Sequence, residues 1–331
     1  MPQRLESLTL WLRQVMDSGD VTITPASTDA SFRRYFRVFR PEGNAADSLI
    51  VMDAPPDKED TGPFVRVSDM LIKAGLHVPE VIERNKEQGF LLLSDLGSQS
   101  YLEALNEQTV DKLYADAMAA LLHMQRHTSY KGGVLPPYDE ALLMQEMELF
   151  REWYLRGHRN LSLTTSQQEM LNTVFHLLAE AALSQPRVFV HRDYHSRNLM
   201  VTSENNPGIL DFQDAVIGPV TYDLVSLLRD CYIQWPQERV EQWALNYLHQ
   251  AAEAGVFQLT PDIDDELLLR WFDWMGVQRH LKAAGIFARL WLRDNKEGYL
   301  KDIPRTLGYV QDVAARYPEL QGLHSLLEEL L

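Results

Sequence analysis

The pattern of hydrophobic and polar positions changes about one third of the way along this 331-residue chain. In the first hundred residues, short apolar runs of strand length alternate with turn-forming residues. The predicted strands are 35–40, 48–54, 78–84 and 89–97. One segment among them, 64–75, has helical spacing and ends at Gly75. The apolar positions Leu5, Leu8, Leu12 and Val15 predict an amphipathic helix at the start of the chain.

From about Thr109 onward, long segments with helical spacing dominate. The predicted helices are 109–127, 138–156, 165–184, 236–254, 262–293 (with a break near Gly285 left open) and 305–315. One strand-rich island, 187–215, lies among them. The sequence therefore predicts an α+β protein with a small β-rich N-terminal lobe, 1–97, and a larger helical lobe, 98–331.

The composition is that of an ordinary globular protein, with 45% hydrophobic and 24% charged residues. The net charge of −16 argues against a nucleic-acid partner or an anionic membrane surface. A single cysteine, Cys231, excludes an intrachain disulfide and is expected in the core. The start of the chain lacks the apolar region of a signal peptide, and no apolar run approaches the roughly 18 residues of a membrane span. We therefore expect a cytoplasmic protein.

The strand-rich island carries the candidate chemistry. An apolar run, VFV, leads into HRDYHSRN and then into the apolar LMV, the turn ENNPG and a short strand that ends at Asp211. This order predicts a loop that presents Asp193 and Asn198 beside a hairpin that presents Asp211. Phosphoryl transfer needs a carboxylate to orient the attacking hydroxyl and oxygen ligands for magnesium, and these three residues supply both. The alternative is a polar loop in an unrelated α+β protein.

HRDYHSRN resembles the H-x-D-x-x-x-x-N catalytic loop of the protein-kinase superfamily, and Asp211-Phe212-Gln213 resembles its D-F-G segment. His195, two residues after the aspartate, is similar to the corresponding position in aminoglycoside phosphotransferases and choline kinases. This resemblance covers nearly the whole chain. It implies a protein-kinase-like bilobal fold that uses ATP and Mg²⁺, with Asp193 as the catalytic base and Asn198 and Asp211 as the magnesium ligands.

Other polar residues near the loop are candidates for substrate contact or for bracing. His195 either contacts the substrate or packs beneath the loop, while His191 is expected to brace it. Asp214, three residues after Asp211, is a candidate to face the substrate pocket. Asp223, near the start of an apolar helix, is expected to brace the loop rather than take part in the chemistry.

The N-terminal lobe departs from the family pattern. Segment 90–97, FLLLSDLG, resembles the adenine-binding hinge, with backbone groups from Leu93 to Asp95. The expected phosphate loop, 27–38, contains no glycine, so Ser31, Phe32 and Arg33 are the candidates for phosphate contact. The alternative for this segment is a solvated turn.

The strand lysine of the family is absent. Met52 and Asp53 stand where it is expected, and Arg66 lies close to the place of its glutamate partner. Our hypothesis is that Arg33, Arg34 or Arg66 neutralises the ATP phosphates instead.

Several segments, including SFRRYFRV, LIVMDAPP and HRDYHSRNLM, are similar to one branch of the family. That branch contains bacterial kinases of cell-wall recycling, which phosphorylate N-acetylmuramate and N-acetylglucosamine at C1. The resemblance implies a small-sugar substrate and a sugar-1-phosphate nucleotidyltransferase as the next enzyme. A kinase of an aminoglycoside or a choline-like alcohol, or a nucleotide-binding pseudokinase, remain the alternatives.

The late helical segment offers a check on the substrate. Arg279, Lys282, Arg289 and Arg293 fall near one face if the helix continues through Gly285. Arg279 would then suit the lactyl carboxylate of N-acetylmuramate. The alternative is a solvated face on an acidic protein.

Overall fold

The computed structural model describes residues 2–28, 32–39, 48–128 and 135–330. It contains two compact units. The N-terminal unit comprises Met1–Ser100 and Leu199–Asp214, and the helical unit comprises Tyr101–Asn198 and Ala215–Leu331. The sequence-based division at residue 97 did not anticipate that Leu199–Asp214 groups with the N-terminal unit.

The N-terminal unit is built on a five-stranded antiparallel sheet with the strand order β1-β2-β3-β5-β4. Its strands are β1 (Thr22–Thr28), β2 (Arg34–Phe39), β3 (Leu49–Asp53), β4 (Val81–Asn85) and β5 (Phe90–Ser94). This sheet, together with the helices of the second unit, confirms the predicted α+β class with a β-rich N-terminal part and a helical remainder.

Helix α1 (Pro2–Val15) packs its apolar face on this sheet. Leu8 and Leu12 are fully buried, and they share a cluster with Val51 and Phe90 from the strands. Leu5, which we expected on the same face, is 40% exposed. Trp11 takes its place, because the buried positions follow the helical spacing 8, 11, 12 and 16 rather than extending to residue 5.

A short hairpin brings Asp211 into the N-terminal unit. Its strands are β7 (Leu199–Met200) and β8 (Gly208–Ile209). Val201 N donates to the carbonyl of Gln99 at 2.9 Å, and Ile209 N donates to the carbonyl of His77 at 2.8 Å. These backbone hydrogen bonds attach the hairpin to segments that connect the strands of the sheet. The hairpin therefore belongs to the N-terminal unit, although it lies about one hundred residues later in the chain.

Helix α2 (Gly62–Lys73) completes the unit. It ends at Ala74, and Gly75 follows with a φ of +84°, as the predicted glycine stop requires. On its inner side, the Phe64 ring lies 4.8 Å from that of Phe212, the residue after Asp211. The helix therefore packs directly against the segment that carries the predicted metal-binding acid.

The helical unit contains the long helices that the spacing predicted. They are α4 (Val110–His127), α5 (Glu140–Leu149), α6 (Thr165–Leu183), α8 (Gln237–Glu253), α9 (Asp265–Asp294) and α10 (Ile303–Ala314). The shorter α3 (Tyr101–Ala104), α7 (Tyr222–Leu228) and α11 (Gln321–Glu328) and the 3-10 turns Glu297–Asp302 and Pro318–Leu320 complete it. The predicted helix 138–156 is instead α5 followed by a π-helix, Phe150–His158.

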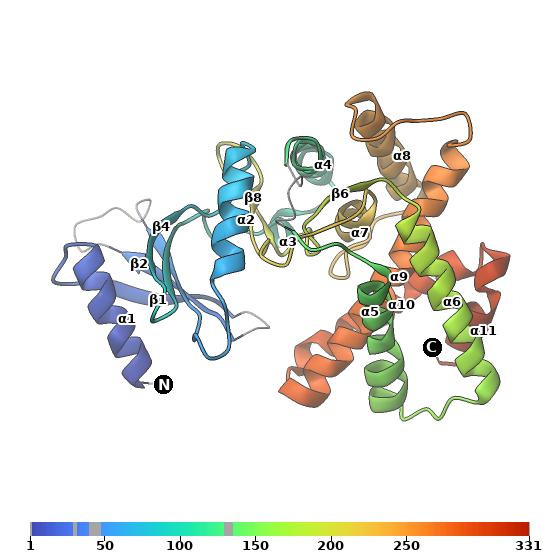
Figure 1. Cartoon of the computed structure of the whole chain (residues 1–331), viewed down its shortest axis with the longest axis horizontal. Helices are drawn as coiled ribbons and strands as arrows, with labels where there is room; N and C mark the ends of the chain where they lie inside the picture. Colours follow the sequence, from blue (N-terminus) through green and yellow to red (C-terminus); the bar gives the residue numbers. More distant parts are fainter. Residues whose placement is uncertain (1, 29–31, 40–47, 129–134, 331) are drawn as a thin grey trace. The chain divides into compact units, whose positions relative to one another are not determined.

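Helix α9 is the central element of this unit. It contacts α5, α6, α7, α8, α10 and the π-helix, and Figure 1 shows it among α5, α6 and α10. It runs without a break through Gly285. A Cβ atom at Gly285 would lie 2.3 Å from the carbonyl carbon of Leu149 and 2.5 Å from the nitrogen of Phe150. Only glycine therefore allows the start of the π-helix to cross α9 this closely.

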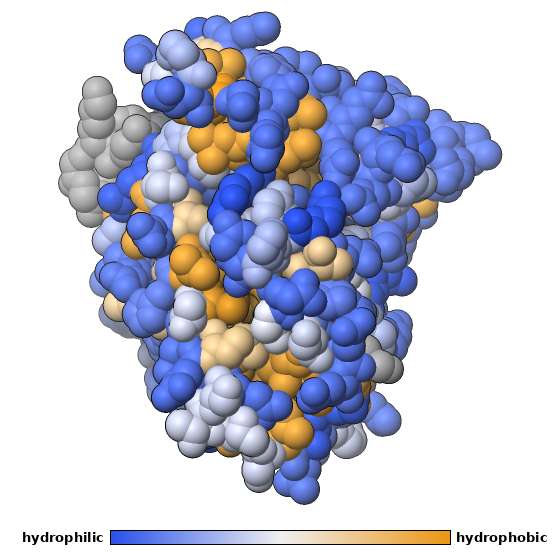
Figure 2. Space-filling model, turned by 90° about the vertical axis from the view of Figure 1, so that its right-hand side faces the viewer, coloured by the Kyte–Doolittle hydropathy of each residue, from blue (hydrophilic) through white to orange (hydrophobic). Residues whose placement is uncertain are grey.

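The face shown in Figure 2 is largely hydrophilic, and hydrophobic side chains reach it in separate patches. The core residues instead lie inside the two units, and Cys231 is buried as expected. Among the described residues, no helix is both long enough and apolar enough to span a membrane.

We predict that Gly285→Ala lowers the free energy of unfolding by about 1–3 kcal/mol or more, because the added methyl group meets rigid backbone atoms. Gly308→Ala in α10 is the matched control, since a Cβ there meets nothing within 4 Å. This control should be neutral or stabilising by up to about 1 kcal/mol. Urea unfolding measures both variants, and an unchanged midpoint for Gly285→Ala would contradict the close crossing.

Candidate active site

The loop with the HRDYHSRN motif follows strand β6 (Arg187–Val190), which pairs with β9 (Val216–Pro219) in the helical unit. The buried carboxylate of Asp223, in α7, holds the start of this loop. It accepts the backbone N–H of His191 at 2.7 Å and that of Arg192 at 2.9 Å. This confirms the predicted bracing role of Asp223. Arg192 has a φ of +79°, an uncommon conformation for a residue other than glycine, and the brace holds it there.

A second buried carboxylate, Asp230, holds the middle of the loop. Its two oxygens accept the backbone N–H groups of Ser196 and Tyr232, each at 2.9 Å. The sequence reasoning missed this residue. Its only signal was an aspartate inside the apolar run LLRDCYI, a position where a carboxylate needs hydrogen-bond donors.

Asp193 and Asn198 come together as predicted. The Asn198 side-chain amide donates to the carbonyl of Asp193 at 3.0 Å, and its backbone N–H donates to the carbonyl of His195 at 2.9 Å. His191 Nδ1 accepts the Asp193 N–H at 3.2 Å, which agrees with the bracing role expected for that histidine. The loop is thus closed on itself by its own polar groups.

The charges around Asp193 favour its ionised form. Burial raises the pKa of the Asp193 carboxyl, but Lys282, His195, Arg192 and Arg279 each lower it and together outweigh that effect. The pKa therefore lies below the usual range, and the group is a carboxylate at neutral pH. Only an ionised carboxylate can accept the proton of an attacking hydroxyl.

His195 packs against Tyr232, with ring centroids 5.3 Å apart in an edge-to-face arrangement. Burial lowers the pKa of His195, although Asp230 and Asp193 act in the opposite direction. Its Nδ1 is buried and has no hydrogen-bond partner among the described residues. The His195 ring thus packs against Tyr232, and its unsatisfied Nδ1 is a candidate contact for the substrate.

The predicted cationic stripe on α9 divides into two parts. Arg279 and Lys282 are buried, with 5% and 8% of their surfaces exposed, while Arg293 is exposed and pairs with Asp294. In the described part of the chain, the Arg279 guanidinium has no carboxylate within 4.0 Å, and its one hydrogen-bond acceptor is the Cys231 sulfur at 3.7 Å. A buried, unpaired guanidinium is costly, so Arg279 is a candidate anion-binding group.

In the N-terminal unit, Asp211 lies beside a second acid and an arginine. Its Oδ1 accepts from the Gln213 side chain at 2.8 Å and pairs with Arg33 at 3.5 Å. Gln213 also donates to the exposed Asp214, at 3.2 Å. Asp211 has a φ of +64°, which aspartate tolerates better than most residues. The glutamine at the usual glycine position thus links two acids.

The predicted nucleotide-binding residues have different environments. The ladders of β5 end near Leu93 and Ser94, so the backbone groups of Asp95 are the first beyond the sheet. The Asp95 side chain accepts from Arg37 and Ser48. Burial raises the pKa of the Asp95 carboxyl, but these donors outweigh it and hold the pKa below its usual range. Its side chain is thus already engaged.

Phe32 is 65% exposed, and its backbone N–H donates to the Glu59 side chain at 3.2 Å. Ser31 lies outside the described residues.

Asp53, at the place of the missing lysine, is fully buried. It pairs with Arg4 of α1 at 2.6 Å and with Arg34 of β2. Arg66 is exposed on α2. Of the three arginines considered as substitutes for the lysine, Arg34 is therefore engaged in a structural pair, and Arg33 is the one beside Asp211.

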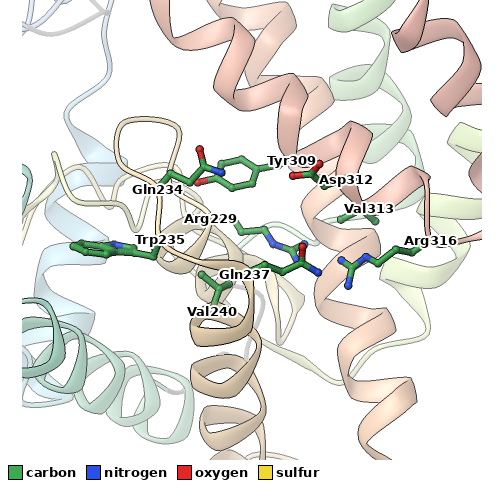
Figure 3. A pocket seen from close by; sticks show the side chains of 9 residues that line it. All are labelled: Arg229, Gln234, Trp235, Gln237, Val240, Tyr309, Asp312, Val313 and Arg316. Carbon is green, nitrogen blue, oxygen red and sulfur yellow. The ribbon is translucent and has the colours of Figure 1, made fainter. Parts of the chain in front are cut away.

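Figure 3 shows a cavity of the helical unit. Arg229, Tyr309 and Arg316 are among the residues that line it. Asp273 pairs with Arg229 at 2.7 Å and with Arg316 at 3.1 Å, and Glu241 pairs with Arg316 at 2.7 Å, so two carboxylates compensate the two charges within the protein. This cavity contains none of the site residues predicted from the sequence.

The model of the phosphotransferase enzyme family matches residues 22–261. The chain belongs to this family. The chain is similar over 99% of its length to proteins named N-acetylmuramate/N-acetylglucosamine kinase. One, from Pseudomonas putida, is 47% identical with 96% of its own length covered, and one from Neisseria meningitidis is 43% identical, also with 96% covered.

Solved structures of much lower sequence identity share the fold of this chain. A choline kinase from Cryptosporidium parvum has a TM-score of 0.66 at 12% identity, covering 97% of this chain and 99% of its own. An aminoglycoside phosphotransferase in complex with gentamicin has a TM-score of 0.60 at 14% identity, covering 91% and 95%. At these identities the likeness concerns the fold alone.

We predict that Asp223 makes stability depend on pH. Burial raises the pKa of Asp223 to about 7, although the N–H groups of His191 and Arg192 oppose the shift. The unfolded value is about 3.9, so the folded protein binds this proton more tightly. The contribution of Asp223 to stability should therefore decrease as the pH rises from about 4 to about 7 and stay constant above.

Asp223→Asn removes this titration. The difference in unfolding free energy between the variant and the unmodified protein should therefore change between pH 4 and 7 and level off above pH 7. A difference that stays flat across the whole range would show that Asp223 does not titrate in this way.

Proposed function

We propose that this protein transfers the γ-phosphoryl group of ATP to the anomeric hydroxyl of N-acetylmuramate and N-acetylglucosamine. The observation that supports this most is the similarity over 99% of the chain to kinases named for these two sugars, at up to 47% identity. Family membership and the ionised state of Asp193 are consistent with phosphoryl transfer.

In this proposal, Asp193 orients the anomeric hydroxyl and accepts its proton, while the γ-phosphoryl bond to the leaving ADP breaks and the new bond to the sugar oxygen forms. Asn198 and Asp211 are the magnesium ligands. The carboxylate and amide oxygens suit this hard cation, which uses one or two carboxylates together with substrate phosphates. When bound, magnesium would neutralise charge on the phosphates.

The N-terminal unit is proposed to bind the nucleotide. Backbone groups from Leu93 to Asp95 would contact adenine, and Ser31 and Phe32 would approach the phosphates. Arg33 is our choice for the replacement of the missing lysine. Its ion pair with Asp211 supports this, because it brings a guanidinium to the acid that is proposed to bind the metal.

Arg279, His195 and Asp214 are the proposed substrate contacts. Arg279 carries a buried charge with no carboxylate partner among the described residues, and the lactyl group of N-acetylmuramate would supply one. N-acetylglucosamine lacks that group, so Arg279 would distinguish the two sugars. We propose a cytoplasmic reaction whose sugar 1-phosphate is the substrate of a nucleotidyltransferase in peptidoglycan recycling.

The proposed function can be tested directly with a panel of acceptors. ATP consumption should be measured with both amino sugars, with choline and with kanamycin, and phosphorus NMR should identify each product. We expect turnover with the amino sugars and a phosphate coupled to the anomeric proton. Turnover only with choline or kanamycin would favour another small-molecule kinase. ATP binding without any turnover would favour a pseudokinase.

We predict that Arg33→Gln raises the KM for ATP and lowers kcat, together reducing kcat/KM for ATP by about 10–100-fold, as expected for a lost charge-assisted contact. Arg66→Gln, which changes an exposed arginine of the same unit, is the matched control and should have little effect. Equal kinetics for Arg33→Gln and Arg66→Gln would rule out Arg33 as the substitute for the lysine.

We predict that Arg279→Gln reduces kcat/KM for N-acetylmuramate about 10–100-fold more than that for N-acetylglucosamine, because only the first sugar offers a carboxylate. Arg293→Gln at the exposed end of the same helix serves as the control. A loss of the same size for both sugars would mean that Arg279 does not bind the carboxylate.

A further inference from the structure

Glu146, a buried residue of α5 that the sequence analysis did not single out, contacts four polar side chains, one of them in the loop that carries Asp193. It is 4% exposed. Its Oε1 pairs with the Arg192 guanidinium and with Lys282 Nζ, the latter at 2.9 Å. Its Oε2 accepts from the Tyr138 hydroxyl and from the Gln278 amide, the latter at 3.2 Å.

The donors to Glu146 come from three parts of the helical unit. Tyr138 precedes α5, Arg192 belongs to the catalytic loop, and Gln278 and Lys282 lie one turn apart on α9. Burial raises the pKa of Glu146, but Lys282 and Arg192 outweigh that effect and hold the pKa below its usual range. Glu146 is therefore ionised at neutral pH, and it pairs with Arg192 of the loop.

Arg192 is the residue immediately before Asp193, and it is fixed from two sides. Asp223 holds its backbone N–H, and Glu146 holds its side chain, which also lies over the Tyr138 ring at 5.8 Å. Because Arg192 has a positive φ, both restraints act on a backbone conformation that is rare for arginine. The direction of the Asp193 side chain depends on that conformation.

Lys282 is fixed in the same way. Its ammonium donates to the Tyr222 hydroxyl at 3.0 Å and pairs with Glu146. Burial lowers the pKa of Lys282, but Glu146 and Tyr222 outweigh it, so the pKa lies above its usual range and the charge is retained. Buried cations of this kind require a carboxylate partner.

The Asp193 carboxylate is affected by the same two cations without being paired to them. Arg192 and Lys282 both lower its pKa, yet among the described residues no Lys, Arg or His nitrogen lies within 4.0 Å of its oxygens. Asp193 is also the nearby acid that would attract these cations if Glu146 were neutral. A cation on Asp193 would compete with the acceptor hydroxyl for the carboxylate.

We propose that Glu146 is a positioning residue for phosphoryl transfer: it holds Arg192 and Lys282 away from the Asp193 carboxylate and so keeps this carboxylate available to the acceptor hydroxyl. The inference rests on the proposed kinase function, but not on the identity of the sugar. It assigns a role to the buried ion pairs that the loop motif alone does not reveal.

The test is a double-mutant cycle of Glu146→Gln and Lys282→Met. Glu146→Gln alone should lower kcat at least about tenfold and leave the KM for ATP within about threefold, because the nucleotide contacts are elsewhere. Lys282→Met alone should have a smaller effect, since Arg192 still balances Glu146. The double variant removes both charges and should recover several-fold in kcat over Glu146→Gln.

The controls separate positioning from packing. Glu148→Gln changes a glutamate of the same helix that pairs with Arg151 near the surface, and it should leave kcat unchanged. Thermal unfolding of every variant reports stability. If Glu146→Gln does not fold, Glu146→Asp keeps the charge on a shorter side chain, which cannot hold both cations in the same place and should also lower kcat.

A Glu146→Gln enzyme with normal kcat, a double variant no more active than Glu146→Gln, or a Glu146→Asp enzyme with normal kcat would each overturn the proposal. Activities are compared with the unmodified protein for whichever acceptor it uses, and with ATP hydrolysis where no acceptor is used. A failure of the proposed sugar specificity is therefore distinguishable from a failure of this inference.

Discussion

Buried carboxylates hold the loop that carries Asp193 by accepting its backbone N–H groups. Asp223 binds the N–H groups of His191 and Arg192, and Asp230 binds that of Ser196. Hydrogen bonds from backbone N–H groups to buried carboxyl oxygens matter in a low-dielectric interior, where an unpaired N–H group is costly. They allow Arg192 to keep an unusual backbone conformation, and through it they set the position of Asp193.

The side chains around this loop also determine the charge of Asp193. A buried carboxyl group would normally be neutral, which would prevent it from accepting a proton. Arg192, Lys282 and Arg279 bring three positive charges toward the two carboxylates Asp193 and Glu146, and the excess keeps Asp193 ionised. An incoming anionic substrate or phosphoryl group would balance the remaining charge, which is a physical reason for a cationic site in a protein of net charge −16.

Local patterns in the sequence predicted the architecture and the loop well. The strand and helix runs, the Gly75 stop and the pairing of Asp193 with Asn198 depend on residues close together in the chain. The division at residue 97 did not anticipate that the hairpin Leu199–Asp214 groups with the N-terminal unit, because its attachment to the sheet depends on backbone bonds to remote residues.

Glu146 and Asp230 were missed for a related reason. An acid within a helical or apolar run gives no local indication of its partners, and the partners of Glu146 lie up to 136 residues away in Lys282. Asp53 illustrates the same limit. The sequence revealed that the lysine is missing. Only the fold shows that Asp53, which stands at its place, forms ion pairs with Arg4 and Arg34. Charge networks are thus the least predictable part of this site.

The central claim is that the ionised Asp193 carboxylate drives phosphoryl transfer without contributing to nucleotide affinity. Asp193→Asn keeps the size of the side chain and removes its charge, so the variant should be compared with the unmodified protein by kcat and by calorimetric ATP binding. We predict that kcat falls by about 10²–10⁴-fold while the Kd for ATP changes by no more than about twofold. A variant that retains near-normal kcat would contradict the account.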